Sequence, residues 1–187
     1  MLAKTSEIST IYARKSLLLP QQTIQPTLQT MQIGDQAPEL LGIDESGQEI
    51  RLSQFQGQKL VLYFYPKDNT AGCTAEACSL RDNYSELRKK GYAIVGVSVD
   101  SAASHQKFKQ KHELPFQLIA DTDHTLVEQM GVWAEKSMYG RKYFGTVRTT
   151  FIIDEQGRIE DIIQGKQIKT KSHGEQLLQR ERAESKK

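Results

Sequence analysis

Short apolar runs alternate with segments of helical spacing along the middle of this chain, and this alternation restricts the fold more than any other feature. Residues 60–65 (LVLYFY) and 92–99 (YAIVGVSV) are almost continuously apolar, which is typical of strands buried on both faces. Between these runs, apolar residues recur every three or four positions: Ala77, Leu80, Tyr84 and Leu87. The spacing predicts a helix over residues 73–90, ended by Gly91. Buried strands separated by helices indicate an α/β fold.

The remaining segments complete a mixed sheet. Residues 39–55 and 145–165 each read as two strands around a glycine-containing turn, so the sequence predicts a β-hairpin near the start of the domain and another near its end. Further helices are expected over residues 101–114, 124–131 and 172–187, and a strand over 115–121. We therefore predict a mixed central β-sheet flanked by helices, with an N-terminal β-hairpin.

The first 30 residues differ in character from the rest. They are rich in Gln, Thr and Ser and have no sustained periodicity, so we expect an extension that is disordered or loosely docked, followed by one domain over residues 31–187. The longest apolar run, residues 17–19, is too short for a secretory signal. Lys4, Arg14 and Lys15 leave an organelle transit peptide as an alternative. Another alternative is that translation starts at Met31, so that the first 30 residues are not part of the protein.

Charge and composition limit the kinds of partner and compartment that the sequence supports. The 25 basic and 23 acidic residues give a net charge of +2, and this balance gives no argument for nucleic acid or an anionic membrane as a partner. No apolar run approaches the roughly 20 residues of a membrane span. Two cysteines in 187 residues do not make the disulfide framework of a secreted protein. We therefore expect a reducing compartment, the cytoplasm, where a close pair of cysteines tends to be catalytic or redox-sensing.

The first cysteine, Cys73, is expected in the first turn of its helix, directly after a strand and a loop that contains Pro66. Unpaired backbone N–H groups and the positive end of the helix dipole favour an anion there. Thiolates are stabilised at such positions and beside cations. Thr70 is the expected helix cap, with its hydroxyl directed toward the same place.

The second cysteine, Cys78, follows five residues later on the same predicted helix. On an ideal helix this spacing separates the two Cα atoms by roughly 8.7 Å, whereas a disulfide needs about 4.4–6.8 Å. The two thiols therefore cannot bond while the helix is intact. The spacing suits a disulfide that forms transiently, after the first turn or two have unwound.

One other interpretation of the cysteines remains at this point, and two more are disfavoured. Both can be small buried hydrophobic residues with no chemical role. A zinc site is disfavoured, because the chain has only four histidines and none lies close to the cysteines in sequence. A thioredoxin-type exchange site would have CxxC spacing at this junction, and the chain does not.

Two stretches resemble the peroxiredoxin family: YFYPKDNTAGCTAEACSLRD (residues 63–82) and GTVRTTFIIDEQGRI (residues 145–159). The five-residue gap is similar to the bacterioferritin comigratory protein or peroxiredoxin Q branch, and the resemblance extends from about residue 31 to 178. The family pattern of proline, threonine and peroxidatic cysteine matches Pro66, Thr70 and Cys73. The chain departs from the branch at Ala71, where proline is common.

The resemblance implies a thioredoxin-like fold and a thiol peroxidase that reduces hydrogen peroxide and organic hydroperoxides. Cys73 is then the nucleophile and Cys78 the resolving cysteine, joined transiently in an intramolecular disulfide that thioredoxin reduces. Arg148 matches the catalytic arginine, expected on a late strand, where it would stabilise the thiolate and the charge that develops as the O–O bond breaks. Thr70 would hydrogen-bond the peroxide, and Pro66 would pack over the sulfur. No metal, haem or flavin is implied.

Alternatives to this function are a redox-sensing disulfide switch, a holdase-like binding protein and a disulfide reductase. A monomer or weak dimer is expected. Between residues 131 and 145 the chain collects aromatic residues and methionine, which either line an apolar wall for organic hydroperoxides or the reductant, or form a loop packed on the core: Trp133, Met138, Tyr139, Tyr143 and Phe144.

Overall fold

The computed structural model describes residues 30–138 and 140–184, so the prediction for the N-terminal extension and that for the last three residues lie outside the described part. The strands are β1 (Leu40–Ile43), β2 (Glu49–Arg51), β3 (Lys59–Phe64), β4 (Tyr92–Ser98), β5 (Gln117–Ala120), β6 (Trp133–Met138), β7 (Arg141–Thr146), β8 (Thr149–Ile153) and β9 (Ile159–Gln164). The α-helices are α1 (Ala71–Asp82), α2 (Tyr84–Lys89), α3 (Ala102–His112), α4 (Thr125–Gln129) and α5 (His173–Glu184).

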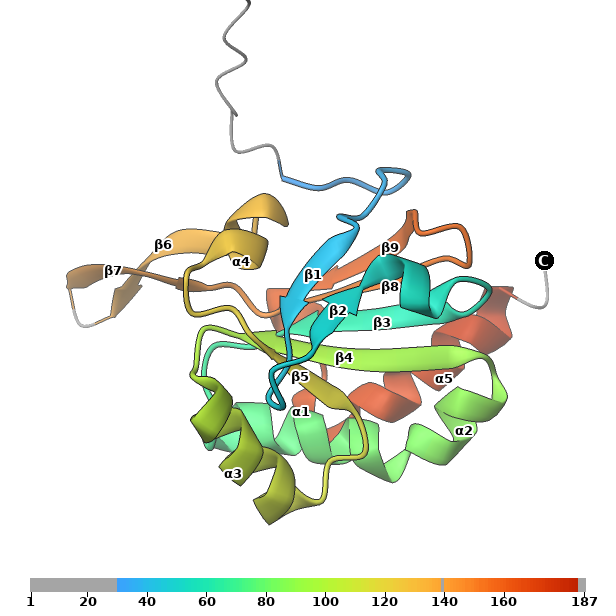
Figure 1. Cartoon of the computed structure of the whole chain (residues 1–187), viewed down its shortest axis with the longest axis horizontal. Coiled ribbons are helices and arrows are strands. Elements are labelled where there is room, and N and C mark those ends of the chain that lie inside the picture. Colours follow the sequence, from blue (N-terminus) through green and yellow to red (C-terminus); the bar gives the residue numbers. More distant parts are fainter. Residues whose placement is uncertain (1–29, 139, 185–187) are drawn as a thin grey trace, which may run out of the picture.

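The central sheet has five strands in the order β5-β4-β3-β8-β9. β3, β4 and β5 run parallel to one another, whereas β8 lies antiparallel to β3 and β9 antiparallel to β8. The prediction of a mixed sheet is therefore confirmed, and so are the two hairpins, because β1 pairs with β2 and β8 with β9. Figure 1 shows α1, α2, α3 and α5 on one side of this sheet and the β1–β2 hairpin with α4 on the other.

The residues of β3 explain why both faces of the sheet are covered. Successive side chains of a strand point to opposite faces. Leu60, Leu62 and Phe64 belong to the core under β1, β2 and α4, whereas Val61 and Tyr63 belong to the core that contains α1, α2 and α3. All five are fully buried, as expected for a strand that is apolar at every position.

The predicted long helix is in fact two helices, α1 and α2, divided at Asn83. The Asn83 side chain donates a hydrogen bond to the carbonyl of Ser79, at 2.9 Å, and so competes with the backbone pattern of the helix. The apolar spacing continues across the division, because Tyr84 and Leu87 still face the same core. Periodicity alone therefore could not reveal the break.

Residues 133–146 form a separate two-stranded sheet, β6–β7, so the interpretation of residues 131–145 as a loop packed on the core is wrong. Tyr143 and Phe144 are 45% and 60% exposed, so these two rings do not pack on the core. In Figure 1 this hairpin extends away from the central sheet. Its sequence lacks the clean alternation of a half-buried strand, so the pattern did not predict these two strands. The alternative, an apolar wall for organic hydroperoxides or the reductant, stays a prediction.

Within the described residues, no helix has the length and apolar character needed to cross a bilayer.

Candidate active site

The loop that follows β3 leads directly to the helix that carries the first cysteine. Tyr65 still donates its backbone N–H to Val97 of β4, at 3.1 Å, but Pro66 has no N–H to donate and the chain leaves the sheet there. Asn69 has a positive φ of 57°, which turns the loop into α1. Cys73 is the third residue of that helix, in its first turn as predicted, and it is only 2% exposed.

Arg148 and Cys73 are in direct contact. The guanidinium donates from Nη2 to the Cys73 Sγ at 3.1 Å. Arg148 lies in the short link between β7 and β8 and not inside a strand, so that detail of the prediction is wrong. The register explains the contact, because Thr149 pairs with Phe64 at the end of β3, directly before the loop that leads to Cys73. A fixed cation at this distance favours negative charge on the sulfur.

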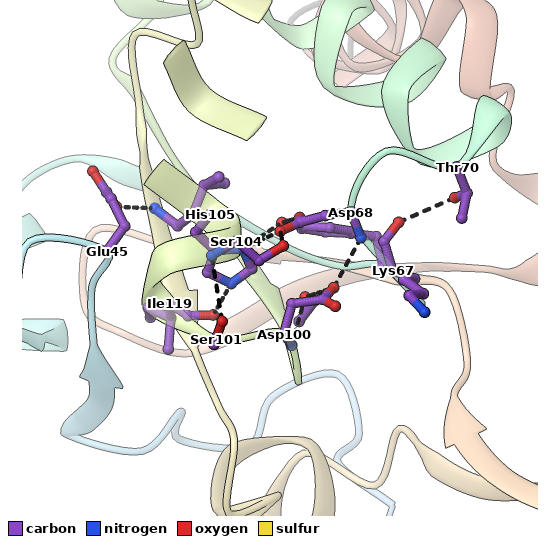
Figure 2. Close-up of polar contacts among 12 residues, drawn as sticks. Glu45, Lys67, Asp68, Thr70, Asp100, Ser101, Ser104, His105 and Ile119 are labelled. Carbon is purple, nitrogen blue, oxygen red and sulfur yellow. Dashed lines mark hydrogen bonds and ion pairs between the residues drawn. The ribbon is translucent and has the colours of Figure 1, made fainter. Parts of the chain in front are cut away.

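Thr70 occupies the N-cap position of α1, as predicted, but its side chain makes no capping hydrogen bond. The hydroxyl donates instead to the carbonyl of Lys67, at 3.0 Å, within the active-site loop (Figure 2). Thr70 is exposed and Pro66 is half-buried. Their expected contacts with a peroxide and with the sulfur remain predictions.

Glu76 completes the group around the sulfur and was missed in the sequence. It lies three residues after Cys73 on α1, is fully buried, and pairs with Nη1 of Arg148. Burial raises the pKa of the Glu76 carboxyl to about 7, although the opposing effect of Arg148 holds it down. The sequence did contain a signal for this contact, because residues three apart on a helix are neighbours and Glu76 follows Cys73 at that spacing.

His173 lies on the far side of the Glu76 carboxylate. Its Nε2 is 3.9 Å from Oε1 of Glu76 and 2.9 Å from the hydroxyl of Thr150. Burial lowers the pKa of His173, so the ring is neutral at pH 7. Oε1 of Glu76 has no hydrogen-bond partner among the described residues. The ion pair with Arg148 is therefore the main interaction that stabilises the charge of this carboxylate.

The loop between Pro66 and Thr70 is anchored by a second buried network, drawn in Figure 2. The Asp68 carboxylate accepts hydrogen bonds from Tyr65 at 2.8 Å and Ser104 at 2.7 Å, and His105 Nδ1 lies 2.8 Å from it. The backbone N–H of Asp68 donates to Asp100, at 2.8 Å. Burial acts to raise the pKa of Asp68, but these hydrogen bonds outweigh it, so the pKa is lowered.

Cys78 has different surroundings. It is half-buried on the same helix, and its Sγ lies 4.0 Å from Nδ1 of His112, the last residue of α3. Both cysteines are free thiols. Because α1 is continuous from Ala71 to Asp82, the two residues sit on an intact helix, the state in which their spacing prevents a disulfide.

Two further features bear on what the site can hold. No group of three or more His, Cys, Asp or Glu side chains suited to a metal ion occurs in residues 30–138 and 140–184. A cavity of about 590 Å³ lies between β1, β5 and α4, lined by Leu41, Ile119 and Leu126. None of the five predicted site residues lines this cavity; Cys73 and Arg148 lie together at the N-terminus of α1 instead.

Comparison with known proteins agrees with this geometry. Residues 33–162 match the model of the AhpC/TSA family. The chain belongs to this family. It is 44% identical to peroxiredoxin Bcp of Bacillus subtilis over 150 residues, which cover 80% of this chain and 94% of that protein. It is 43% identical to peroxiredoxin Bcp of Escherichia coli over 148 residues, covering 79% and 94%.

Solved structures that align with this chain are also peroxiredoxins of this kind. A peroxiredoxin Q variant from Xylella fastidiosa aligns with a TM-score of 0.75 at 34% identity, covering 84% of this chain and 99% of that one. The bacterioferritin comigratory protein of Xanthomonas campestris, studied for alkyl peroxide reduction, aligns with a TM-score of 0.70 at 32% identity, covering 80% and 99%. The predicted thioredoxin-like fold and the peroxiredoxin assignment are confirmed, so the protein is a thiol-dependent peroxidase.

Proposed function

We propose that Cys73 is the peroxidatic cysteine of this peroxiredoxin, that Arg148 activates it, and that Cys78 resolves the oxidised form. The observation that carries the proposal is the 3.1 Å contact between Arg148 Nη2 and Cys73 Sγ at the N-terminus of α1. A thiolate there is stabilised by the guanidinium and by the free backbone N–H groups of the first turn. Cys78 lies beyond the first turn of α1, with its sulfur 4.0 Å from Nδ1 of His112 and in electrostatic contact with Arg81.

In the first step, the Cys73 thiolate attacks one peroxide oxygen. The S–O bond forms and the O–O bond breaks, so the sulfur is oxidised by two electrons and the peroxide is reduced. The leaving oxygen takes a proton and departs as water or an alcohol, and Cys73 is left as a sulfenic acid. Arg148 stabilises the charge on the oxygens as the bond breaks. Thr70 hydrogen-bonds the peroxide, and Pro66 shields the sulfur from water.

In the second step, Cys78 attacks the sulfenic sulfur of Cys73, forming the S–S bond and releasing water. The first turns of α1 must unwind, because the helix holds the two Cα atoms about 8.7 Å apart. A dithiol reductant of the thioredoxin type then reduces the disulfide and closes the cycle. The reaction as written uses no metal, haem or flavin.

The wider setting of the enzyme follows from its relatives and its composition. Reduction of organic hydroperoxides is supported by the Xanthomonas campestris relative studied for alkyl peroxide reduction. We propose a catalytic domain over residues 31–187 after a 30-residue extension, acting as a monomer or weak dimer in the cytoplasm, without nucleic-acid or membrane partners. An organelle-targeted form is the alternative, since peroxiredoxin Q of Oryza sativa, named as chloroplastic, is 38% identical over 146 residues.

The test is a rapid-mixing experiment on the reduced protein with hydrogen peroxide, comparing wild type, Cys73→Ser and Cys78→Ser. We expect Cys73→Ser to lose the reaction. Cys78→Ser should keep the first oxidation and accumulate a sulfenic acid without the intramolecular disulfide. If Cys73→Ser consumes peroxide as fast as wild type, the roles are assigned wrongly. Repeated turnover with thioredoxin separates an enzyme from a redox sensor, which oxidises once per molecule.

A further inference from the structure

The second cysteine is held against the end of a neighbouring helix by several contacts. Nδ1 of His112 lies 4.0 Å from the Cys78 Sγ. The next turn of α1 is tied to the same residue, because Arg81 Nη1 donates to the carbonyl of His112 at 2.7 Å. The His112 ring also packs edge-to-face on Phe108, with centroids 5.1 Å apart. The imidazole is therefore fixed in position beside the thiol.

We propose that His112 is the base that takes the proton of Cys78 when the oxidised Cys73 is resolved. This inference rests on the proposed function, in which Cys78 is the resolving cysteine. A thiolate, and not a thiol, attacks in disulfide formation. Arg148 beside Cys73 is a permanent cation and cannot accept a proton, whereas Nδ1 of His112 lies 4.0 Å from the Cys78 sulfur.

The charge state of His112 suits a base. Burial, followed by the nearby Lys111 and Arg81, lowers the pKa of His112, so the ring is neutral at pH 7. The charged groups around this contact are Arg81 and Asp82 from α1 and Lys111 and Glu113 from the end of α3. Nε2 is buried with no hydrogen-bond partner among the described residues. In the tautomer that carries its proton on Nε2, the ring offers the lone pair of Nδ1 to Cys78.

The proton balance of the step is then complete. His112 takes the proton from the Cys78 sulfur while α1 is still folded. After the helix unwinds, the thiolate attacks the sulfenic sulfur of Cys73, the S–S bond forms and the S–O bond breaks. The departing hydroxide takes a proton from the imidazolium, directly or through solvent, and leaves as water. No external oxidant or reductant is required beyond the peroxide already consumed in the first step.

The test separates the two steps in one turnover. Reduced protein is mixed with one equivalent of hydrogen peroxide, quenched in acid at successive times, and resolved by intact mass into thiol, sulfenic acid and disulfide. His112→Phe keeps a ring against Phe108 but has no base. We expect sulfenic acid to form at the wild-type rate and disulfide formation to slow by about 100-fold, as is typical for the loss of a general base. The control is His124→Asn, because His124 contacts Trp133 and not Cys78.

A second measurement distinguishes a base from a residue that only holds the helix in place. His112→Ala should recover part of its disulfide-forming rate when imidazole is added, and the wild-type pH dependence of this step should be flatter in His112→Phe. Disulfide formation in His112→Phe that is as fast as in wild type, or faster, overturns the inference alone. A wild-type protein that never joins Cys73 to Cys78 overturns the proposed function as well.

Discussion

Cys73 and Cys78 lie five residues apart on α1, and the fold gives the two sulfurs different surroundings. Cys73 is 2% exposed, sits in the first turn of the helix and accepts a hydrogen bond from Arg148. Cys78 is half-buried, lies about a turn and a half further along, and has its Sγ 4.0 Å from Nδ1 of His112, with Arg81 interacting with it electrostatically. The difference lies in the group that touches each sulfur: a cation that hydrogen-bonds to Cys73 stabilises its thiolate at all times, whereas the neutral imidazole beside Cys78 can take a proton from its thiol.

This difference matches the order of events in the proposed cycle. The nucleophile must be ionised before peroxide arrives, so it requires a fixed charge that does not titrate near pH 7, and arginine provides one. The resolving thiol has to ionise only after the first step. The predictions below test this contrast, starting with the largest expected effect.

Arg148→Met should remove the feature that distinguishes Cys73 from Cys78. We expect the rate of the first oxidation to fall by about 10²–10³-fold, the usual loss when one donor to developing charge is removed. The rapid-mixing assay measures this rate, and Arg141→Met, on an exposed position of β7, is the control. An unchanged rate would contradict the role of Arg148.

The same change leaves the buried Glu76 without its partner, so the free energy of unfolding should also fall, by about 3–5 kcal/mol. The double variant Arg148→Met with Glu76→Gln separates the two effects. It should regain most of the lost stability and none of the lost rate. Recovery of both would mean that the arginine acts only through folding.

Glu76→Gln should change how stability depends on pH. The pKa of Glu76 is raised from 4.5 to about 7 in the folded state. A raised pKa means that this group contributes stability below pH 4.5, and the contribution is lost as pH rises through 7. The loss is on the order of 3 kcal/mol. Urea unfolding between pH 4 and 8 should show this decline in wild type and not in Glu76→Gln; parallel curves would refute it.

Asp68→Asn tests whether the buried loop anchor matters for Cys73 and not for Cys78. We expect a fall in the first oxidation of about tenfold or less, together with a loss of about 1–3 kcal/mol in the free energy of unfolding, because neighbouring donors lose an ionised acceptor. The lowered pKa of Asp68 contributes stability above pH 3.8 that is lost as pH falls through the folded value, so acid unfolding should become less steep.

A double-mutant cycle with His105→Asn tells whether Asp68 acts through its contact with His105. Additive effects of the two changes would mean that the two side chains act independently. Disulfide formation from the sulfenic acid should keep its wild-type rate in both variants. A slower second step would show that the anchor serves both cysteines.

Lys136→Met should have the smallest effect. Lys136 lies on β6, interacts electrostatically with both Arg148 and Cys73, and donates to the carbonyl of Thr146. Burial and the repulsion of Arg148 lower its pKa. Removing this second cation should slow the first oxidation about two- to fivefold. Lys142→Met, with an exposed side chain on the same hairpin, is the control; equal rates in both variants would exclude a contribution from Lys136.

Much of the central sheet was predictable, because its signals are local. The runs at β3 and β4 are apolar on both faces, and Gly157 lies at the turn of the last hairpin with a positive φ of 83°. The position of Cys73 in the first turn of a helix was equally predictable. The β6–β7 hairpin and the break at Asn83 were not, because the pairing of β6 with β7 and the bond from Asn83 to Ser79 leave no periodic pattern.

The sequence by itself determined the place of Cys73 in the first turn of its helix and the spacing that keeps the two thiols apart, since these depend only on helix geometry and on residues close together in the chain. Only the tertiary structure decided which distant side chain contacts each sulfur. Arg148 reaches Cys73 because β8 pairs with β3, and His112 reaches Cys78 because α3 ends beside α1. These contacts join residues 75 and 34 positions apart, and side-chain packing across such separations leaves no local pattern in a single sequence.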